Sequence, residues 1–528
     1  MIALHSRYKP QAEAGRYLDA LSIPPHIRCF ILIEPGLGYM IPLLSERFPG
    51  ARIIALHVSA SRDRGALSVE NGNVVYWDPS HRLPAVEFVG RELEELSKDG
   101  GALGPGGEAF GPGGGAFGPG GGGFGPESIK IIEWRPSRDF YGDSYVKLLA
   151  AAAAAIRRFD AERRTLRAFG RRWFRNFFRN LCLLRYFPLL RDIRETAGPI
   201  LVTGSGPSLE ESLPLIKMLR ERQNCRIIAA SSSVMALLYR QIVPDFVVST
   251  DGGGWALLHL YELFRAGGGT AGSLAVSLIA KLPSQCGGLP ILGIADGSLW
   301  QGLILRGLGF PHLVLPQRGT VTATALDLAL ALGRGKIIIA GMDLDTRGIR
   351  THARPYSFDR LWREGASRFR GEYSQSFFRQ MAAREGGSYR IYAEWFASRL
   401  DSYGGRLYTL GSNNPLFAGL PRIRAQDLSV PMGVSTDIQG AFPPSCGEGP
   451  VPVRSFPSGN AVPRALDILM AALEDPNTRE SIVGELAPLL LPGTIVHEKE
   501  GGREADRDRV AAAIRGQLES LSRLSGEI

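Results

Sequence analysis

Short apolar runs alternate with helical or glycine-rich stretches over most of the chain, and this alternation predicts strands joined by helices. The longest series of apolar runs follows Gly198, at Ile200–Thr203, Arg226–Ala230, Phe246–Thr250, Leu274–Ile279, Pro290–Ile294 and Lys336–Ala340. Strands that alternate with helices form a mostly parallel sheet with helices on its faces. We therefore expect an α/β fold whose central domain, residues 198–425, holds a doubly wound, mostly parallel sheet.

A smaller α/β domain is predicted over residues 1–140. The apolar run Cys29–Ile33 is followed by a turn that contains Gly36 and Gly38, by an apolar helix and by the strand Arg52–Leu56. We expect Ile129–Trp134 to return to the same sheet. This order resembles half of a Rossmann fold, in which such glycines approach a cofactor, but the third glycine is missing. The turn is thus either a cofactor site or only a structural turn.

The remaining segments are predicted to be helical or irregular. Residues 141–197 read as an amphipathic, arginine-rich connecting helix, and residues 426–528 as a C-terminal helical domain with helices at Ala461–Leu473, Glu480–Leu491 and Asp506–Leu524. Between Gly100 and Pro126 a Gly-Pro pair recurs every seven residues. Because glycine loses much entropy on ordering, we expect this repeat to be an insertion in a surface loop without a catalytic role.

Charge is concentrated in one window of the 528-residue chain. The net charge is 61 − 52 = +9, and residues 157–194 alone contribute 12 − 3 = +9 from twelve arginines and three acids. Such a stripe could bind nucleic acid or anionic lipid, but a charged helical stripe is usually a solvated face or an interdomain contact, and we favour that interpretation. The five cysteines stand too far apart for a zinc site. Without an apolar run of membrane-spanning length or a signal peptide, we expect a cytoplasmic protein.

The first candidate site is the turn Gly204-Ser205-Gly206-Pro207-Ser208, which directly follows a predicted strand. Glycines allow a tight turn and close backbone approach, and the N–H groups at the start of the next helix attract phosphate. The segment is therefore either a phosphate cradle or a plain turn. It lacks the Lys-Ser/Thr ending of a Walker loop, which disfavours a P-loop kinase.

Two carboxylates follow other predicted strands. Asp251 comes after Phe246–Thr250 and Asp343 after Lys336–Ala340. Ligands of open parallel sheets bind beyond the carboxyl ends of the strands, so these residues could hold a ribose hydroxyl or a metal ion, although Asp251 could instead cap a helix. His352 lies on the loop after Asp343. It is either a general base near neutral pH or an ordinary surface histidine.

As an ordered set, these motifs resemble the motility accessory factor family of flagellin glycosyltransferases. The segments that carry the resemblance are Gly-Ser-Gly-Pro-Ser-Leu from Gly204, Ile-Val-Pro-Asp with Asp251 six residues later, Gly-Met-Asp-Leu around Asp343 and Thr-His-Ala around His352. The central domain of this family is shared with MptE-like 6-hydroxymethylpterin diphosphokinases and is similar in fold to bacterial sialyltransferases. The N-terminal Ile-Glu-Pro-Gly-Leu-Gly-Tyr and the helical Arg-Trp-Phe-Arg-Asn resemble its spirochaete-type members, so the resemblance covers most of the chain.

The resemblance implies a nucleotide-sugar site. The donor would be bound or bordered by Gly204, Ser205, Gly206, Pro207, Ser208, Ser231, Asp251, Thr320 and Asp343, and His352 would be the base. Our leading hypothesis is an inverting glycosyltransferase that moves a nonulosonic, sialic-acid-like sugar from a CMP donor to Ser or Thr of flagellin, with no metal or other cofactor required. Ser205 stands where sialyltransferases carry asparagine, which leaves the donor open. The segment Tyr408–Pro415 is similar to a sialyltransferase loop near the donor.

Two alternatives remain at this stage. One is pyrophosphate transfer from ATP to a hydroxymethylpterin, for which Asp251 and Asp343 would hold Mg²⁺. The other is a non-catalytic protein that uses the arginine helix to dock flagellin, another protein or a nucleic acid, although we do not expect a nucleic-acid partner. Metal-dependent consumption of ATP would favour the first of these, and salt-dependent binding of a macromolecule alone the second.

Overall fold

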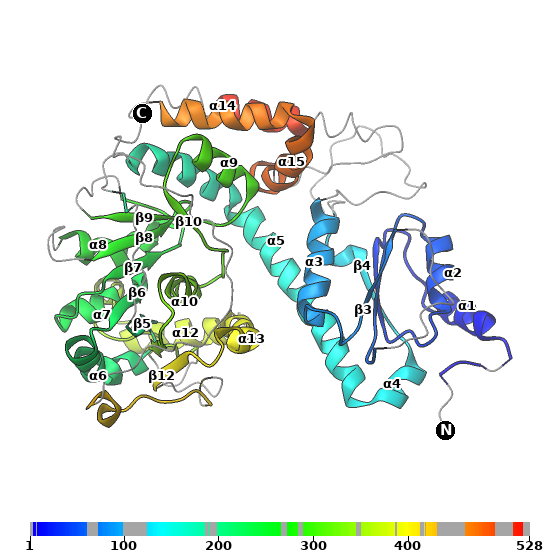
Figure 1. Cartoon of the computed structure of the whole chain (residues 1–528), viewed down its shortest axis with the longest axis horizontal. Coiled ribbons are helices and arrows are strands. Elements are labelled where there is room, and N and C mark those ends of the chain that lie inside the picture. Colours follow the sequence, from blue (N-terminus) through cyan, green and yellow to red (C-terminus); the bar gives the residue numbers. More distant parts are fainter. Residues whose placement is uncertain are drawn as a thin grey trace. The chain divides into compact units, whose positions relative to one another are not determined.

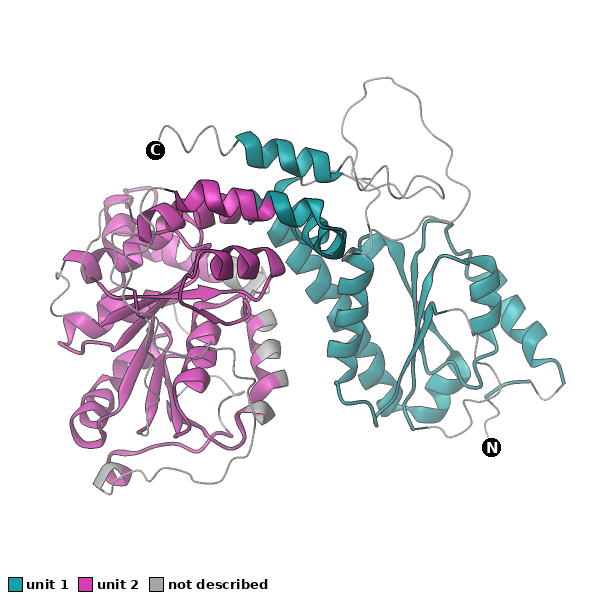
Figure 2. Cartoon of the chain, turned by 45° about the horizontal axis from the view of Figure 1, so that its top comes forward, with its two compact units in different colours: residues 1–171, 470–528 teal, residues 172–469 magenta. Residues whose placement is uncertain are grey.

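The computed structural model describes most of the chain, namely residues 4–6, 8–60, 72–98, 124–184, 189–190, 198–265, 272–283, 289–344, 350–385, 388–411, 417, 419–429, 460–491 and 510–520. These residues form two compact units, one of residues 1–171 and 470–528 and one of residues 172–469 (Figure 2). The divisions fall within helix α5 (Asp143–Leu183) and helix α14 (Ala461–Glu474). The helices predicted near the C-terminus are thus shared between the two units.

The first unit is built on a four-stranded parallel sheet. Its strands lie in the order β3 (Val74–Trp77), β2 (Arg52–Leu56), β1 (Cys29–Ile33) and β4 (Ile129–Glu133). Apolar side chains of α1 (Pro10–Ala20) and α2 (Met40–Arg47) pack on one face, and those of α3 (Ala85–Lys98) and α5 on the other. The short helix α4 (Arg135–Tyr141) follows β4. The predicted Rossmann-like arrangement is therefore present.

The glycine turn after β1 is packed by the chain's own histidine. Gly36 and Gly38 adopt left-handed backbone conformations, with φ of 64° and 79°. The Leu37 N–H donates to His5 Nε2 at 3.0 Å, and a Cβ on Gly36 would lie only 2.4 Å from that nitrogen. Because the His5 ring takes up the space that glycine leaves, the structure gives this turn a packing role.

The second unit contains an eight-stranded sheet in which every neighbouring pair is parallel. Its strands, in chain order, are β5 (Ile200–Thr203), β6 (Arg226–Ala230), β7 (Phe246–Ser249), β8 (Ser273–Ser277), β9 (Ile291–Ala295), β10 (His312–Val314), β11 (Ile337–Ala340) and β12 (Leu407–Gly411). They lie side by side in the order β10-β9-β8-β7-β6-β5-β11-β12. The chain therefore moves outward from β5 and then returns to its other side at β11, which makes the β5–β11 boundary a topological switch point.

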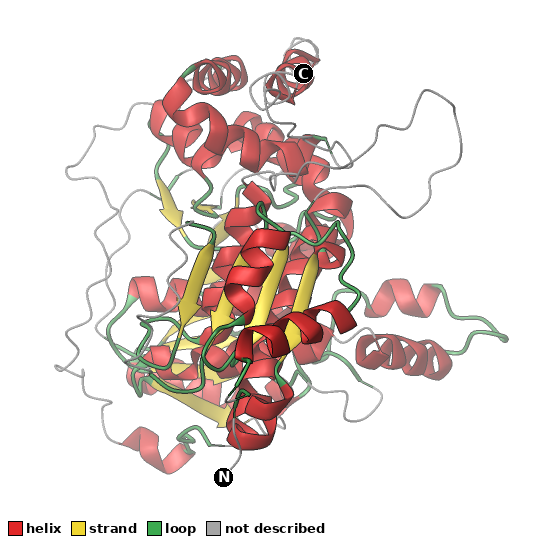
Figure 3. Ribbon diagram, turned by 90° about the vertical axis from the view of Figure 1, so that its right-hand side faces the viewer, coloured by secondary structure: helices red, strands yellow, loops and turns green. Residues whose placement is uncertain are grey.

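Helices cover this sheet on both faces (Figure 1), whereas the four-stranded sheet of the first unit is the one that faces the viewer in Figure 3. The helices of this unit between β5 and β12 are α6 (Ser208–Gln223), α7 (Val234–Tyr239), α8 (Leu257–Arg265), α9 (Leu299–Gly307), α10 (Val321–Leu332), α11 (Asp359–Glu364), α12 (Glu372–Glu385) and α13 (Ser388–Arg399). Helix α10 is almost wholly apolar and packs on the central strands. The predicted doubly wound sheet is confirmed. Near the C-terminus follow α15 (Pro476–Leu490) and a helical stretch at 510–520.

The last turns of α5 hold two loops of the second unit. Asn176 Nδ2 donates to the carbonyl oxygens of Gly252 and Ile279, both at 3.0 Å, and Asn180 Nδ2 donates to those of Leu278 and Ala280, both at 2.8 Å. Both asparagines are buried. The end of this helix thus fixes the loops that follow β7 and β8, while the arginines Arg167, Arg175 and Arg179 are exposed.

Only the end of the predicted Gly-Pro insertion can be compared with the structure. The Gly-Pro repeat lies outside the described residues up to position 123, but its last phenylalanine, Phe124, is buried and its ring lies 5.6 Å from that of Phe159.

Within the described ranges, no helix combines the length and apolar character needed to cross a bilayer.

Candidate functional site

The two loops at the switch point approach each other backbone to backbone. The Gly204 N–H donates to Ala340 O, and the Gly206 N–H donates to Gly341 O at 2.8 Å. A Cβ on Gly204 would lie 2.5 Å from Gly341 O, which is closer than side chains tolerate. Glycine is therefore required here by the contact between the two loops, and this requirement needs no ligand.

The N-terminus of α6 is occupied by a carboxylate of the protein. Asp343 is buried, and its Oδ2 accepts a hydrogen bond from the Ser208 N–H at 2.8 Å. The partial positive charge of a helix N-terminus stabilises such a carboxylate. Since Pro207 has no N–H and the Gly204 and Gly206 amides are already bonded, the amides we assigned to a phosphate are largely engaged within the protein.

A third loop, residues 350–354, is fixed to this turn. The Ala353 N–H donates to Ser205 O at 2.8 Å, and the Arg354 N–H donates to Glu210 Oε1 at 2.9 Å. Glu210, in the first turn of α6, also pairs with the Arg350 guanidinium at 3.1 Å. These contacts hold His352 beside the glycine turn. The structure thus brings together the turn, Asp343 and His352, as the sequence predicted.

His352 lies in an aromatic and weakly hydrated environment. Its ring stacks on Tyr356 with a centroid distance of 4.0 Å and an interplanar angle of 14°, and its Nδ1 lies 2.9 Å from Thr351 Oγ1. Burial lowers the pKa of His352 to about 4, and the nearby His259 contributes to the decrease. The imidazole is therefore neutral at neutral pH, with a lone pair available to accept a proton.

A second histidine, His259 of α8, was missed by the sequence analysis. Its ring centroid lies 5.5 Å from that of Tyr356, so two imidazoles contact the same tyrosine. Burial lowers the pKa of His259 to about 4, although the negative charge of Asp251 acts to raise it. No motif distinguishes this histidine within its helix. Only the tertiary contact with Tyr356 identifies it.

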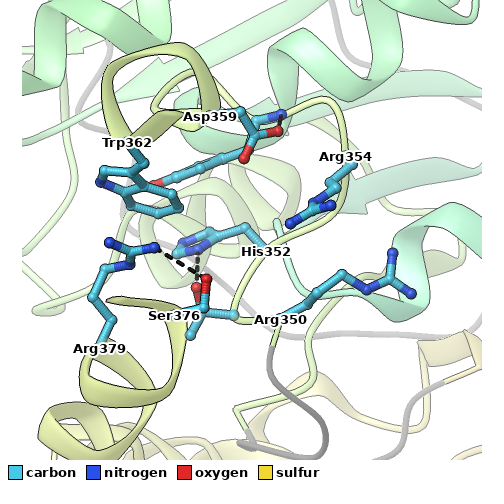
Figure 4. Close-up of a pocket in the computed structure, with 9 residues that line it drawn as sticks. Arg350, His352, Arg354, Asp359, Trp362, Ser376 and Arg379 are labelled. Carbon is cyan, nitrogen blue, oxygen red and sulfur yellow. Dashed lines mark hydrogen bonds between the residues drawn. The ribbon is translucent and has the colours of Figure 1, made fainter. Parts of the chain in front are cut away.

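A small recess opens beside His352 (Figure 4). Its lining residues are Arg350, Thr351, His352, Arg354, Tyr356, Asp359, Trp362, Ser376 and Arg379, and its volume is about 20 Å³. That is room for roughly one water molecule, so a larger ligand would have to extend out of the recess. Arg379 lies 3.8 Å above the Trp362 ring centroid and donates to Ser376 Oγ at 3.1 Å. No sequence motif marks the residues of α11 and α12.

The other predicted site residues have local structural roles or lie apart. Asp251 is exposed, and its Oδ1 accepts from the Gly253 N–H at 2.7 Å. Thr320 caps α10 by accepting from the Ala323 N–H at 3.0 Å. Ser231 is buried in the one-turn helix η4 (Ser231–Ser233) directly after β6. Of the predicted donor loop around Tyr408, residues 412–416 are outside the described ranges.

The two predicted magnesium ligands follow strands that are not neighbours in the sheet. Asp251 follows β7 and Asp343 follows β11, and β6 and β5 lie between these strands. Three strand spacings, roughly 14 Å, separate the two strands, and each carboxylate already accepts a backbone N–H bond. Across the described part of the chain, His, Cys, Asp and Glu side chains form no group of three or more that could hold a metal ion.

Comparisons with known proteins place an MptE-like domain in this chain. A family model described as "6-hydroxymethylpterin diphosphokinase MptE-like" matches residues 172–348. The match includes the glycine turn, Asp251, Thr320 and Asp343, but it ends before His352 and the arginines of the recess. The predicted resemblance of the central domain is confirmed for this segment.

Individual relatives match parts of the chain. An uncharacterized protein of Treponema pallidum is 29% identical over 273 residues, which are 51% of this chain and 56% of that protein. The 6-hydroxymethyl-7,8-dihydropterin pyrophosphokinase of Methanothermobacter thermautotrophicus is 32% identical over 158 residues, 29% of this chain and 60% of that protein. The chain thus spans less than two thirds of the length of either relative. The structure of a Maf glycosyltransferase from Magnetospirillum magneticum AMB-1 aligns with a TM-score of 0.48 and 13% identity, over 97% of this chain and 83% of that chain.

Proposed function

We propose that the protein is a glycosyltransferase of the motility accessory factor type, which transfers a sialic-acid-like sugar from a CMP donor to Ser or Thr of flagellin. One observation supports this proposal above the others: a neutral imidazole, His352, is fixed at the switch point beside a recess lined by arginines. Sugar transfer needs a base for the acceptor hydroxyl and positive charge for the departing phosphate. Both lie side by side here.

In this proposal His352 accepts the proton of the acceptor hydroxyl. Its Nδ1 faces the Thr351 hydroxyl, so Nε2 is the nitrogen left for the substrate. As the acceptor oxygen forms its bond to the anomeric carbon, the bond from that carbon to the phosphate oxygen breaks, and CMP leaves with the electron pair. A pKa near 4 makes the free imidazole a weak base. The negative charge of the bound nucleotide raises that pKa and so favours proton transfer.

The glycine turn then acts chiefly by positioning. Ser205 O and Glu210 hold the loop that carries His352, and Asp343 fixes the start of α6. We retain Gly204 to Ser208, Ser231, Asp251, Thr320 and Asp343 as the proposed border of the donor site. Most amides of the turn already have partners, so we assign phosphate binding to side chains instead.

The second candidate function is pyrophosphate transfer from ATP to a hydroxymethylpterin. The 32% identity to a 6-hydroxymethyl-7,8-dihydropterin pyrophosphokinase favours it. This reaction relies on Mg²⁺ to bridge the phosphates. Asp251 and Asp343 follow strands that lie three positions apart in the sheet, and each already accepts a backbone N–H bond.

One pair of assays distinguishes the two functions. The purified protein is incubated with CMP-N-acetylneuraminate and flagellin, with and without EDTA, and separately with ATP, Mg²⁺ and 6-hydroxymethyl-7,8-dihydropterin. We expect release of CMP together with a gain of flagellin mass, both insensitive to EDTA. Formation of AMP that requires Mg²⁺ and the pterin, without any CMP release, would instead establish the diphosphokinase.

A further inference from the structure

Two arginines of the recess lack the carboxylate partner that the third one has. Arg350 is paired with Glu210, which lies outside the recess. Within the described part of the chain, no ion pair joins a carboxylate to the guanidinium of Arg354 or Arg379. Figure 4 shows these two side chains approaching His352 from opposite sides, whereas the Arg350 side chain points away.

The recess has a net positive charge. Asp359 is the one acidic residue among those that line it, and its Oδ2 already accepts from the Tyr356 N–H at 2.8 Å. Glu210 offsets the charge of Arg350, and His352 is neutral. Two positive charges against one negative charge therefore remain; Arg354 is exposed and Arg379 half-buried. Such a site favours an anionic ligand group.

The orientation of Arg379 is fixed before any ligand arrives. Its guanidinium is stacked on Trp362 and anchored by Ser376 Oγ, and the Trp362 ring in turn packs 5.3 Å from Tyr356, on which His352 stacks. A planar guanidinium held in this way can donate two parallel hydrogen bonds to a carboxylate or phosphate. The arrangement is pre-organised for an oxyanion next to the imidazole.

We propose that Arg354 and Arg379 bind an oxyanion of the sugar donor, either its carboxylate or its phosphate, beside His352. This inference rests on the proposed glycosyltransferase function. In an activated 2-keto acid sugar, the carboxylate and the phosphate oxygen are both bonded to the anomeric carbon. An arginine pair next to the base would therefore lie at the reacting carbon, whichever oxyanion it holds. If the pair holds the carboxylate, it also selects acidic donors, because a neutral aldose donor has no carboxylate at that position.

The test compares Arg354→Gln and Arg379→Gln with wild type and with Arg360→Gln. Arg360 is a matched control because it is an exposed arginine of α11 that pairs with Glu364 and does not line the recess. Each protein is titrated with CMP, with CMP-N-acetylneuraminate and with N-acetylneuraminate alone. Arg379→Lys, which keeps the charge but not the planar fork, and a melting curve for each variant separate loss of binding from loss of folding.

We expect the two glutamine variants to weaken binding of at least one anionic probe about tenfold or more, with Arg360→Gln unchanged. If the variants bind both CMP and the CMP-sugar more weakly, the recess holds the phosphate. If they bind CMP as wild type does but the CMP-sugar more weakly, the recess holds the carboxylate. Folded variants that bind all three probes as wild type does would overturn the inference while leaving the glycosyltransferase proposal intact. Arginine-dependent binding of the free acid, with no binding of either nucleotide, would keep the recess and remove the proposed function. If wild type binds none of the probes, both fail.

Discussion

The Asp343 carboxylate accepts a hydrogen bond from the Ser208 N–H at 2.8 Å and so occupies the helix terminus that follows the glycine turn. A buried carboxylate in this position accepts the N–H group of the helix terminus, as a bound phosphate does in many nucleotide sites. It joins the loop after β11 to the start of α6, and the loop that bears His352 is docked on the same turn. The site is therefore held in shape without a ligand.

Removing this carboxylate should destabilise the second unit. We expect Asp343→Ala to lower the free energy of unfolding by about 1–2 kcal/mol, as loss of a helix cap does, and Asp343→Asn to cost less because its amide oxygen can still accept the bond. Urea unfolding followed by circular dichroism measures both changes. Equal stability of wild type and Asp343→Ala would show that the contact does not hold the loops together.

Gly206 should tolerate no side chain. A Cβ there would lie 2.5 Å from Asp343 Oδ2, so Gly206→Ala must displace the carboxylate or the turn. We expect a loss of roughly 1–3 kcal/mol in stability, with a larger effect for Gly206→Val, which would also disturb nucleotide binding. Gly254→Ala is the matched control, because a Cβ at Gly254 meets nothing within 4 Å. Similar melting temperatures for the Gly206 and Gly254 variants would contradict the packing described here.

The role of His352 can be separated from that of donor binding. We expect His352→Ala to lower turnover by roughly 10²- to 10⁴-fold with little change in the affinity for CMP, because a general base acts on the acceptor proton. Initial rates of CMP release and a CMP titration give the two quantities. Near-normal turnover in this variant would mean that another residue or a water molecule is the base.

The two histidines on Tyr356 should make the protein sensitive to acid. The pKa of His259 and of His352 is about 4 in the folded protein, against an ordinary value of 6.5. The unfolded chain therefore binds more protons between these values, so the stabilisation present above about pH 6.5 is lost as the pH falls towards 4. Stability measured from pH 7.5 to 4.5 should decline less steeply in the double variant His259→Gln, His352→Gln. Identical pH slopes in variant and wild type would assign the acid sensitivity to other groups.

The strands that the sequence predicts correctly are those formed by uninterrupted runs of apolar residues. The runs Cys29–Ile33 and Ile200–Thr203 are strands with the predicted bounds, because every residue of them is buried. Strand β3 was not predicted, since its four residues are only half-buried, and β10 has just three residues. Short, partly exposed strands leave a weak pattern, and their neighbours in the sheet decide their conformation.

Some features of the candidate site were also predictable from the sequence, and others were not. Parallel strands end at one edge of a sheet, so the convergence of the glycine turn, Asp343 and His352 followed from their order in the chain. The capping role of Asp343 did not, because its partner Ser208 lies 135 residues away in the sequence. His259 and Arg379 lie on helices, and no local pattern shows which helical residues face a site built by distant loops.

Variants of the arginine face of α5 test the hypothesis that the protein is a non-catalytic docking protein. Arg167, Arg175 and Arg179 are exposed, and reversing their charge should leave turnover within about twofold if they form a solvated face. Enzyme assays of the triple Arg→Glu variant and salt-dependent flagellin binding provide the measurement. Complete loss of flagellin binding in this variant, together with the absence of any turnover in wild type, would favour a docking protein.

The most direct test of the central claim is the intact mass of flagellin from cells that carry this chain, compared with cells in which it bears His352→Ala. We predict that flagellin from the parent cells carries one or more acidic-sugar masses and that flagellin from the variant cells lacks them, although the variant protein is present at normal levels. Unchanged flagellin mass, accompanied by altered levels of hydroxymethylpterin diphosphate, would contradict the glycosyltransferase account.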